Sequence, residues 1–358
     1  MRIVKSFCVS MFVAVLILSG CATTSAEAGK QSYNQEKERR NIPASELYRG
    51  RPETVVMAPE GYRISSPEKI IFSDQNLKII LYAGKFAQGN AGYFEAIPAD
   101  GAGPVIQKIS FSGRDVPFTE TAWGWRGFFA ISPLAKPGKK DFRVIYRQGD
   151  LEKKISGCVK IRDVKYPVSK RLLDLGKFSD KEYTSRPEFQ KLIKECRRAR
   201  KEAFSSESED SILNGLSHPR DMHKVTGYYW KKRIYAAYKR KGKRKVKVRG
   251  HVSYHRGLDL KGNTGAPVYS MADGKVVLAK KMFYEGNLVV VDHGNKVFSY
   301  YMHMDSMVVK AGDRVRAGEV IGGVGATGTV TGPHLHVALS IRGIHVHPLS
   351  ILSLPVSR

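Results

Sequence analysis

The last third of the chain has the sequence pattern of β-structure. From residue 250 onward glycine is dense, β-branched residues gather in short runs, and apolar residues do not recur at helical spacing. Two such runs, 288–291 and 297–301, flank Asp-His-Gly-Asn at 292–295, which is a good hairpin turn. Further short runs and turns surround this hairpin. The pattern predicts an all-β domain, which we place at residues 212–358.

A second β-rich region precedes it. Between residues 70 and 165, apolar runs such as 77–82 and 142–146 are separated by Gly, Pro and Asp at the spacing of an antiparallel sandwich. The dipeptide Pro137-Gly138 adds a turn signal before a strand. We therefore expect a small immunoglobulin-like β-sandwich over 70–165, without a catalytic constellation. The fold class expected for the whole chain is mainly β.

A helical segment separates the two β-rich regions. Ser185 and Glu188 stand at capping-box spacing, with Pro187 near the first turn. Apolar residues then recur at i, i+3, i+4 and i+7 as Phe189, Leu192, Ile193 and Cys196. This stripe predicts a packing face. Residues 166–211 are expected to form a helical connector that ends in an acidic, serine-rich linker.

The beginning of the chain predicts its compartment. Two cations precede an apolar run, 7–18, which is too short for a comfortable membrane span and is typical of a signal peptide. Leu18-Ser19-Gly20-Cys21 resembles the bacterial lipobox. That resemblance implies that residues 1–20 are a lipoprotein signal peptide and that Cys21 is acylated and holds an exported protein to a bilayer. Because no aspartate follows Cys21, we expect an outer-membrane anchor facing the periplasm; a Gram-positive surface and an unlipidated signal peptide are the alternatives.

Charge bears on the expected partners. Residues 21–69 are polar and rich in Ser, Glu, Lys and Pro, so we expect a lipidated tether there. The net charge of +27 favours anionic partners, of which an exported protein would meet acidic lipid or cell-wall polymer rather than nucleic acid.

Eight cations fall within 239–249, only six residues before His255. This basic run is either a solvated loop or a cationic rim that captures an anionic wall polymer, with Lys243, Arg244 and Lys245 at its centre.

Two cysteines remain beyond the predicted lipidation site at Cys21, namely Cys158 and Cys196. In an oxidising compartment they could form a disulfide. Two buried free thiols are the alternative, because sequence alone does not show whether the Cβ atoms meet.

Histidines cluster after residue 250, where eight of the chain's ten occur. The clustering suggests a metal, because catalytic zinc takes three ligands from His, Asp or Glu and keeps a position open for water. His255 and Asp259 are four residues apart, about 13 Å along a straight strand. Gly257 between them permits the bend that would bring both to one ion.

Two further fragments place histidines at alternate positions. In His334-Leu335-His336 both histidines would share one face of a strand while Leu335 points to the core. One of them can then bind a metal while the other handles protons. Tyr301-Met302-His303 repeats this spacing and adds another histidine. Each fragment alone is more often structural than metallic.

Four motifs appear together and in a fixed order: His255-Arg256-Gly257-Leu258-Asp259-Leu260, Gly265-Ala266-Pro267-Val268, Tyr301-Met302-His303 and Thr331-Gly332-Pro333-His334-Leu335-His336. Over roughly residues 220–350 this set closely resembles the M23 family of zinc metallopeptidases, the lysostaphin-like or LytM domain enzymes that cut peptidoglycan peptides. Val337 and Ala338 depart from the aromatic and acidic residues usual in that family after the last histidine, which leaves the substrate fit open.

The resemblance implies a LytM-type peptidase domain that binds one Zn²⁺ through His255, Asp259 and His336. It implies that His334 is the general base and that His303 assists it and stabilises the oxyanion. The implied function is a zinc-dependent peptidoglycan endopeptidase that hydrolyses cell-wall cross-links by attack of a zinc-bound water. Two alternatives stay open: a peptidoglycan-binding regulator or scaffold of other wall hydrolases, and a peptidase acting on secreted proteins or peptides.

Overall fold

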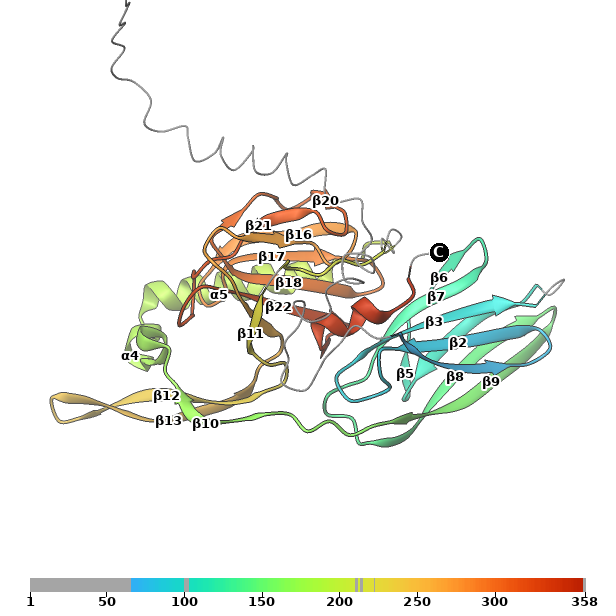
Figure 1. The fold of residues 1–358 in the computed structure, drawn as a ribbon, viewed down its shortest axis with the longest axis horizontal. Coiled ribbons are helices and arrows are strands. Elements are labelled where there is room, and N and C mark those ends of the chain that lie inside the picture. The colour runs from blue at the N-terminus through green and yellow to red at the C-terminus, as the bar shows by residue number, and fades with distance from the viewer. Residues whose placement is uncertain (1–65, 100–102, 210–211, 213–214, 222, 357–358) are drawn as a thin grey trace, which may run out of the picture. The chain divides into compact units, whose positions relative to one another are not determined.

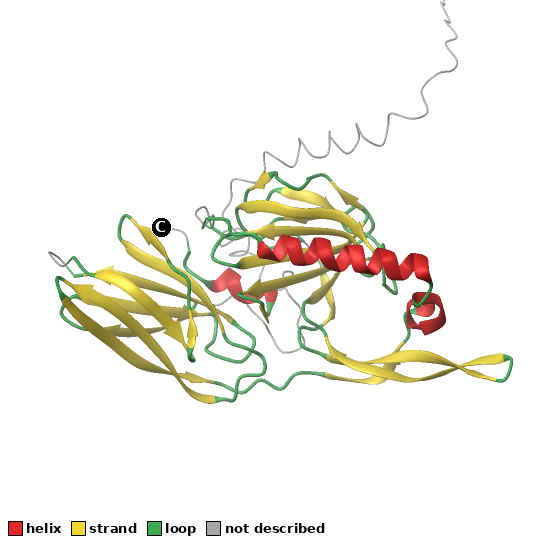
Figure 2. Cartoon of the chain, turned by 180° about the vertical axis from the view of Figure 1, so that it is seen from behind, coloured by secondary structure: helices red, strands yellow, loops and turns green. Residues whose placement is uncertain are grey.

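The computed structural model describes residues 66–99, 103–209, 212, 215–221 and 223–356. The predicted signal peptide and Cys21, and all but the last four residues of the predicted tether, lie outside these ranges. Strands predominate in the described chain, as Figure 2 shows, and the predicted mainly β class is confirmed. In the same ranges no helix is both long and apolar enough to cross a membrane.

The N-terminal region is a sandwich of two antiparallel sheets (Figure 1). The first sheet has the order β1 (Glu68–Ser73), β2 (Leu77–Ala83), β3 (Ala91–Pro98), β7 (Gly124–Ala130) and β6 (Thr119–Thr121). The second has the order β5 (Arg114–Asp115), β4 (Val105–Phe111), β8 (Gly138–Gln148) and β9 (Leu151–Ile161). Buried residues of both sheets, such as Leu81, Phe94 and Phe142, form one core, as expected for a sandwich.

The C-terminal region is built on a larger sheet. Its order is β11 (Lys224–Gly227), β14 (Leu258–Lys261), β22 (His334–Ile341), β18 (Val297–Met304), β17 (Gly286–Asp292), β16 (Gly274–Met282) and β20 (Arg314–Val315), with β23 (Ile344–Val346) also on β22. A three-stranded sheet accompanies it, in the order β15 (Pro267–Tyr269), β21 (Val320–Gly323) and β19 (Ser306–Met307). The 3-10 helix η2 (Pro348–Ser353) follows β23.

Both faces of the larger sheet are covered. Leu335, Val337 and Leu339 of β22 belong to the main core, whereas Ala338 packs in a second cluster on the opposite face. That second cluster includes the buried side of the helix α5 (Pro187–Ser205). The face that carries Ala338 also carries His334 and His336, since alternate residues of a strand point the same way.

The helical segment comprises the 3-10 helix η1 (Gly176–Ser179) and the helices α4 (Lys181–Thr184) and α5. The predicted capping box at Ser185 is wrong. Ser185 is the C-cap of α4 and donates its backbone N–H to the Lys181 carbonyl, so it is not the N-cap of α5. Arg186 is the N-cap and is extended, as expected before Pro187, and its side chain makes no capping bond.

The apolar stripe of α5 packs largely as predicted. Ile193 and Cys196 are buried and Phe189 packs beside them, but Leu192 is 37% exposed.

The thiol of Cys196 is buried in this packing face, whereas Cys158 on β9 is exposed, and both cysteines are free. The structure therefore forms neither the possible disulfide nor two buried thiols.

The basic run forms a hairpin rather than a loop. Strands β12 (Lys232–Lys241) and β13 (Arg244–Tyr254) pair along their length and turn at Gly242, whose φ is +61°. Strand β10 (Val168–Leu173) pairs with β12 in parallel. The hairpin forms because Val246 and Val248 alternate with the cations and favour a strand. Figure 1 shows β12 and β13 as one long two-stranded ribbon.

Candidate metal centre

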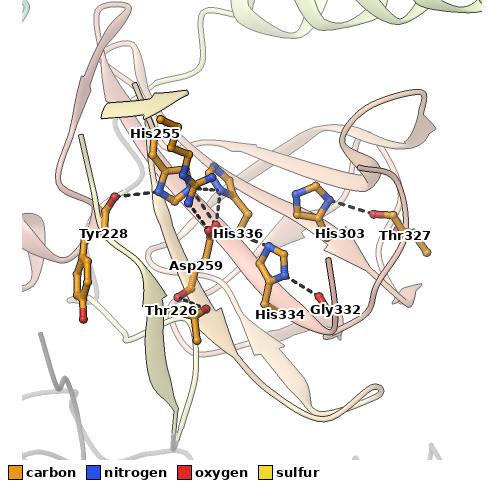
Figure 3. A network of polar contacts seen from close by, with 10 residues as sticks. Thr226, Tyr228, His255, Asp259, His303, Thr327, Gly332, His334 and His336 are labelled. Atoms are coloured by element: carbon orange, nitrogen blue, oxygen red, sulfur yellow. Dashed lines mark hydrogen bonds and ion pairs between the residues drawn. The ribbon is translucent and has the colours of Figure 1, made fainter. Parts of the chain in front are cut away.

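Three side chains at one end of the C-terminal sheet converge on a single point. His255 Nε2 lies 2.9 Å from Asp259 Oδ1, and His336 Nδ1 lies 2.9 Å from each of these two atoms. Within the described residues they are the one group of three His, Cys, Asp or Glu side chains close enough to share an ion. The structure thus brings the predicted ligands together (Figure 3). Two imidazole nitrogens and one carboxylate oxygen fit a zinc ion and leave a position for water.

The register of the sheet places two of the three ligands. Asp259 on β14 lies directly opposite His336 on β22. Residues paired in this way point to the same face of a sheet. Their neighbours Leu258, Leu260 and Leu335 point to the other face and are buried in the main core. Apolar burial on one face therefore fixes the two ligands on the other.

His255 reaches the same point because the chain bends before β14. Trp230 donates its N–H to the His255 carbonyl at 2.6 Å, and His255 donates its own N–H to Lys231 at 3.0 Å. The expected bend at Gly257 is present, although this glycine does not have a positive φ. It is required for space, because a Cβ there would lie 2.7 Å from His336 Nε2.

His255 and Asp259 have the protonation that metal binding requires. His255 Nδ1 lies 2.9 Å from the carbonyl oxygen of Tyr228, so Nδ1 carries the proton and Nε2 keeps its lone pair. Burial lowers the pKa of His255 to about 4 despite the nearby Asp259. Burial also raises the pKa of Asp259, but the charge and hydrogen bond of His255 outweigh this and hold that pKa well below its usual value.

The two remaining predicted histidines lie beside the ligands. His334 Nδ1 donates to Gly332 at 2.8 Å, and its Nε2 lies 3.6 Å from Asp259 Oδ1. His303 Nδ1 donates to the carbonyl of Thr327 at 3.0 Å, and its ring centroid is 5.0 Å from that of His334. Burial, with smaller contributions from neighbouring histidines, lowers the pKa of His303 to about 3. The site therefore holds His303 as a neutral ring with a free Nε2.

A β-bulge places the His303 side chain beside the ligands, whereas regular strand alternation would not. Between the paired residues Tyr301 and Met304, β18 has two residues, whereas β17 has one residue between their partners Val289 and Asn287. His303 has a φ of +64°, which a bulge residue can adopt. Tyr301 is buried in the main core on the opposite face. The expectation that Tyr301 and His303 share one face is therefore wrong.

Sequence reasoning missed a residue that contacts a ligand. Arg233, near the start of β12, places a guanidinium nitrogen 2.6 Å from Asp259 Oδ2, the oxygen that faces away from the histidines. Gly227 leaves room for this pair, since a Cβ there would lie 2.5 Å from the same guanidinium nitrogen. No spacing marks Arg233, which stands in a run of three cations.

The nearby histidines outside the motifs have other partners. His293 is buried and contacts the carbonyl of Asp273 and the hydroxyl of Ser299, each at 2.7 Å. His251 is exposed and stacks on Tyr235, with ring centroids 4.6 Å apart. Neither belongs to the metal-binding group.

Comparison with known proteins gives this domain a family. The sequence model of peptidase family M23 matches residues 253–348. The peptidoglycan DD-endopeptidase ShyB of Vibrio cholerae is 41% identical over 116 residues, which are 32% of this chain and 27% of that protein. The peptidoglycan DD-endopeptidase ShyA of the same organism is 43% identical over 102 residues, which are 28% of this chain and 24% of that protein.

This chain spans about a quarter of the length of these curated relatives. A solved Pseudomonas aeruginosa chain described as a peptidase M23 has a TM-score of 0.48 at 23% identity, covering 75% of this chain and 95% of that one. The match over 253–348 includes His255, Asp259, His303, His334 and His336. The chain therefore carries a domain of peptidase family M23, a family of metallopeptidases, and all five candidate site residues lie within it.

Proposed function

We propose that this protein is a zinc-dependent endopeptidase that hydrolyses the peptide cross-links of peptidoglycan. The observation that carries the proposal is the convergence of His255, Asp259 and His336 on one point, with His303 and His334 beside it. The two curated relatives named as peptidoglycan DD-endopeptidases support the substrate class. The intact ligand set argues against a regulator or scaffold.

Each residue has a task that its contacts define. His255, Asp259 and His336 would hold one zinc ion, which would lower the pKa of a water and polarise the scissile carbonyl. His334 can accept a proton at Nε2, because its Nδ1–H is held by the Gly332 carbonyl. Protonated there, it can return that proton to the leaving amine.

His303 presents a second acceptor nitrogen. Its Nδ1–H is committed to Thr327, so the neutral ring has only a lone pair at Nε2. It can therefore orient water beside His334. The oxyanion role implied by the family resemblance requires a proton on that Nε2, and the ring gains one only as an imidazolium.

The experiment is a metal and activity measurement on His336→Ala. The variant should lose both bound zinc and hydrolysis of isolated sacculi. His251→Gln, which changes an exposed histidine outside the group, should keep both. Hydrolysis that persists in His336→Ala would contradict the proposed mechanism. Zinc binding without hydrolysis by the unmodified protein would favour a regulator or scaffold. Hydrolysis of secreted proteins, with none of sacculi, would favour a peptidase that acts on secreted proteins or peptides.

We also propose that the protein is exported and held at the outer membrane, facing the periplasm, through acylated Cys21. The apolar run 7–18 followed by Leu-Ser-Gly-Cys supports this. The substitution Cys21→Ala should move the protein from the membrane fraction to the soluble fraction. An unchanged membrane fraction would contradict a lipid anchor.

A further inference from the structure

The hairpin β12–β13 has two chemically different faces. On the face that we call the anchored face, Arg240, Lys245 and Lys247 lie at adjacent register positions. Their carboxylate partners belong to the segment around η1 and α4. Lys247 lies 2.5 Å from Asp174, Lys245 lies 2.5 Å from Asp180 and 2.6 Å from Glu182, and Arg240 lies 2.9 Å from Glu182. Three carboxylates thus neutralise three cations.

The opposite face, which we call the free face, carries Lys239, Lys241 and Arg244. Lys241 pairs with Arg244 in register and Lys239 pairs with Val246, so the three cations lie side by side. All three are exposed, and none has a carboxylate partner among the residues that the structure describes. No Asp or Glu occurs in the sequence between Asp221 and Asp259. The free face is therefore a compact, uncompensated positive patch.

The hairpin is continuous with the metal centre. Near the start of β12, Arg233 contacts the ligand Asp259, and β13 ends at Tyr254, directly before the ligand His255. From Arg233, Lys239 and Lys241 of the free face lie about 20–26 Å further along β12. The ion pairs of the anchored face hold the hairpin against the segment around η1 and α4. A substrate held at the metal centre would have to be a long polymer to reach the free face.

We propose that the free face is a docking surface for peptidoglycan, which binds through the carboxylates of its peptide stems at a distance from the bond being cut. This rests on the proposed function. Two observations select this partner: an unpaired positive patch suits a polyanion, and its hairpin is joined to the candidate centre that would cut the polymer. Because the patch is exposed, its attraction is screened by salt over a Debye length of about 8–10 Å.

The test compares two variants that each remove three positive charges. The free-face variant is Lys239→Gln/Lys241→Gln/Arg244→Gln, and the anchored-face variant is Arg240→Gln/Lys245→Gln/Lys247→Gln. Each is made in the full chain with His334→Ala, so that sacculi stay intact while binding is measured by co-sedimentation over a series of salt concentrations. Melting curves check that both variants fold. A third variant, Lys239→Arg/Lys241→Arg/Arg244→Lys, keeps the charge and should bind normally.

The free-face variant should bind sacculi about tenfold more weakly and with a flatter salt dependence, because three exposed charge contacts are lost. The anchored-face variant should bind as the parent does. Equal loss in both variants, or no loss in either, would overturn the proposal. Loss of binding to vesicles of anionic phospholipid, with sacculus binding intact, would overturn it in favour of a lipid surface.

A second readout separates this proposal from the proposed function. With His334 restored, the free-face variant should cleave a small soluble cross-linked muropeptide at the parent rate, since that substrate does not reach the patch. If the parent itself does not cleave this muropeptide, the proposed function fails. Co-sedimentation with sacculi still decides whether the free face binds peptidoglycan. Slower cleavage of the small substrate by the free-face variant would show an effect on the metal centre instead and would overturn the docking role.

Discussion

Arg233→Gln should weaken zinc binding, because Arg233 sets the orientation of a ligand. Its guanidinium lies 2.6 Å from Asp259 Oδ2, while Oδ1 of the same carboxylate lies 2.9 Å from each ligand histidine. The Arg233 and Asp259 side chains are only 18% and 12% exposed, so solvent screens their pairing weakly. Without the guanidinium, the carboxylate is free to turn Oδ1 away from the metal position.

Two effects of the substitution oppose each other. Loss of a hydrogen-bond partner of a ligand typically lowers metal affinity by about 10- to 100-fold, or roughly 1.4–2.8 kcal/mol. Removal of a positive charge beside a dication raises the affinity. Because the ion pair is short and little exposed, we expect orientation to dominate and the dissociation constant for zinc to rise about tenfold. Arg233→Lys keeps the charge without the planar fork and should recover only part of the loss.

The assay is competition for zinc between the protein and a chromogenic chelator at fixed pH. Arg240→Gln is the matched control, because it also removes a paired arginine from β12 but one on an exposed pair far from the ligands in the hairpin register. Its zinc affinity should be unchanged. An unchanged or tighter dissociation constant in Arg233→Gln would refute the positioning role.

Three further perturbations follow from the packing. Gly257→Ala should lower the melting temperature and zinc affinity together, because its Cβ would overlap the Val337 carbonyl and overpacking costs about 1–3 kcal/mol; an unchanged melt would contradict this. Tyr301→Phe leaves the buried Met271 N–H without its 2.7 Å partner, so urea unfolding should show a loss of about 1–2 kcal/mol with no change in zinc affinity. Burial lowers the pKa of His347 to about 3, so the unfolded chain binds more protons below pH 6.5 and stability falls as the pH drops from 6.5 towards 3. His347→Gln should flatten that slope in urea titrations, and an equal slope would contradict the assignment.

The parts of the site that are local in sequence were predictable. Alternation on a strand puts His334 and His336 on one face, and a glycine between His255 and Asp259 allows the chain to bend. The structure shows both features. The mainly β class was equally readable, because short β-branched runs between turn residues recur through most of the chain.

Features that depend on distant partners were not predictable. The bulge that aims His303 arises from the pairing of β18 with β17, and no spacing in the sequence marks it. The Arg233 contact joins residues 26 apart, and the carboxylates that neutralise Lys245 and Lys247 are more than 60 residues away. The sequence therefore indicated one charged segment at 239–249, whereas tertiary contacts divide it into the anchored face and the free face.

Muropeptide analysis tests whether the five site residues form a working peptidase centre for peptidoglycan. The protein is incubated with sacculi with and without a chelator, beside His334→Ala, and the released fragments are identified. If they do form such a centre, cross-linked dimers should fall to monomers only with the unmodified protein and available metal. Dimers that persist under all conditions although zinc is bound, or that disappear equally with His334→Ala, would contradict it.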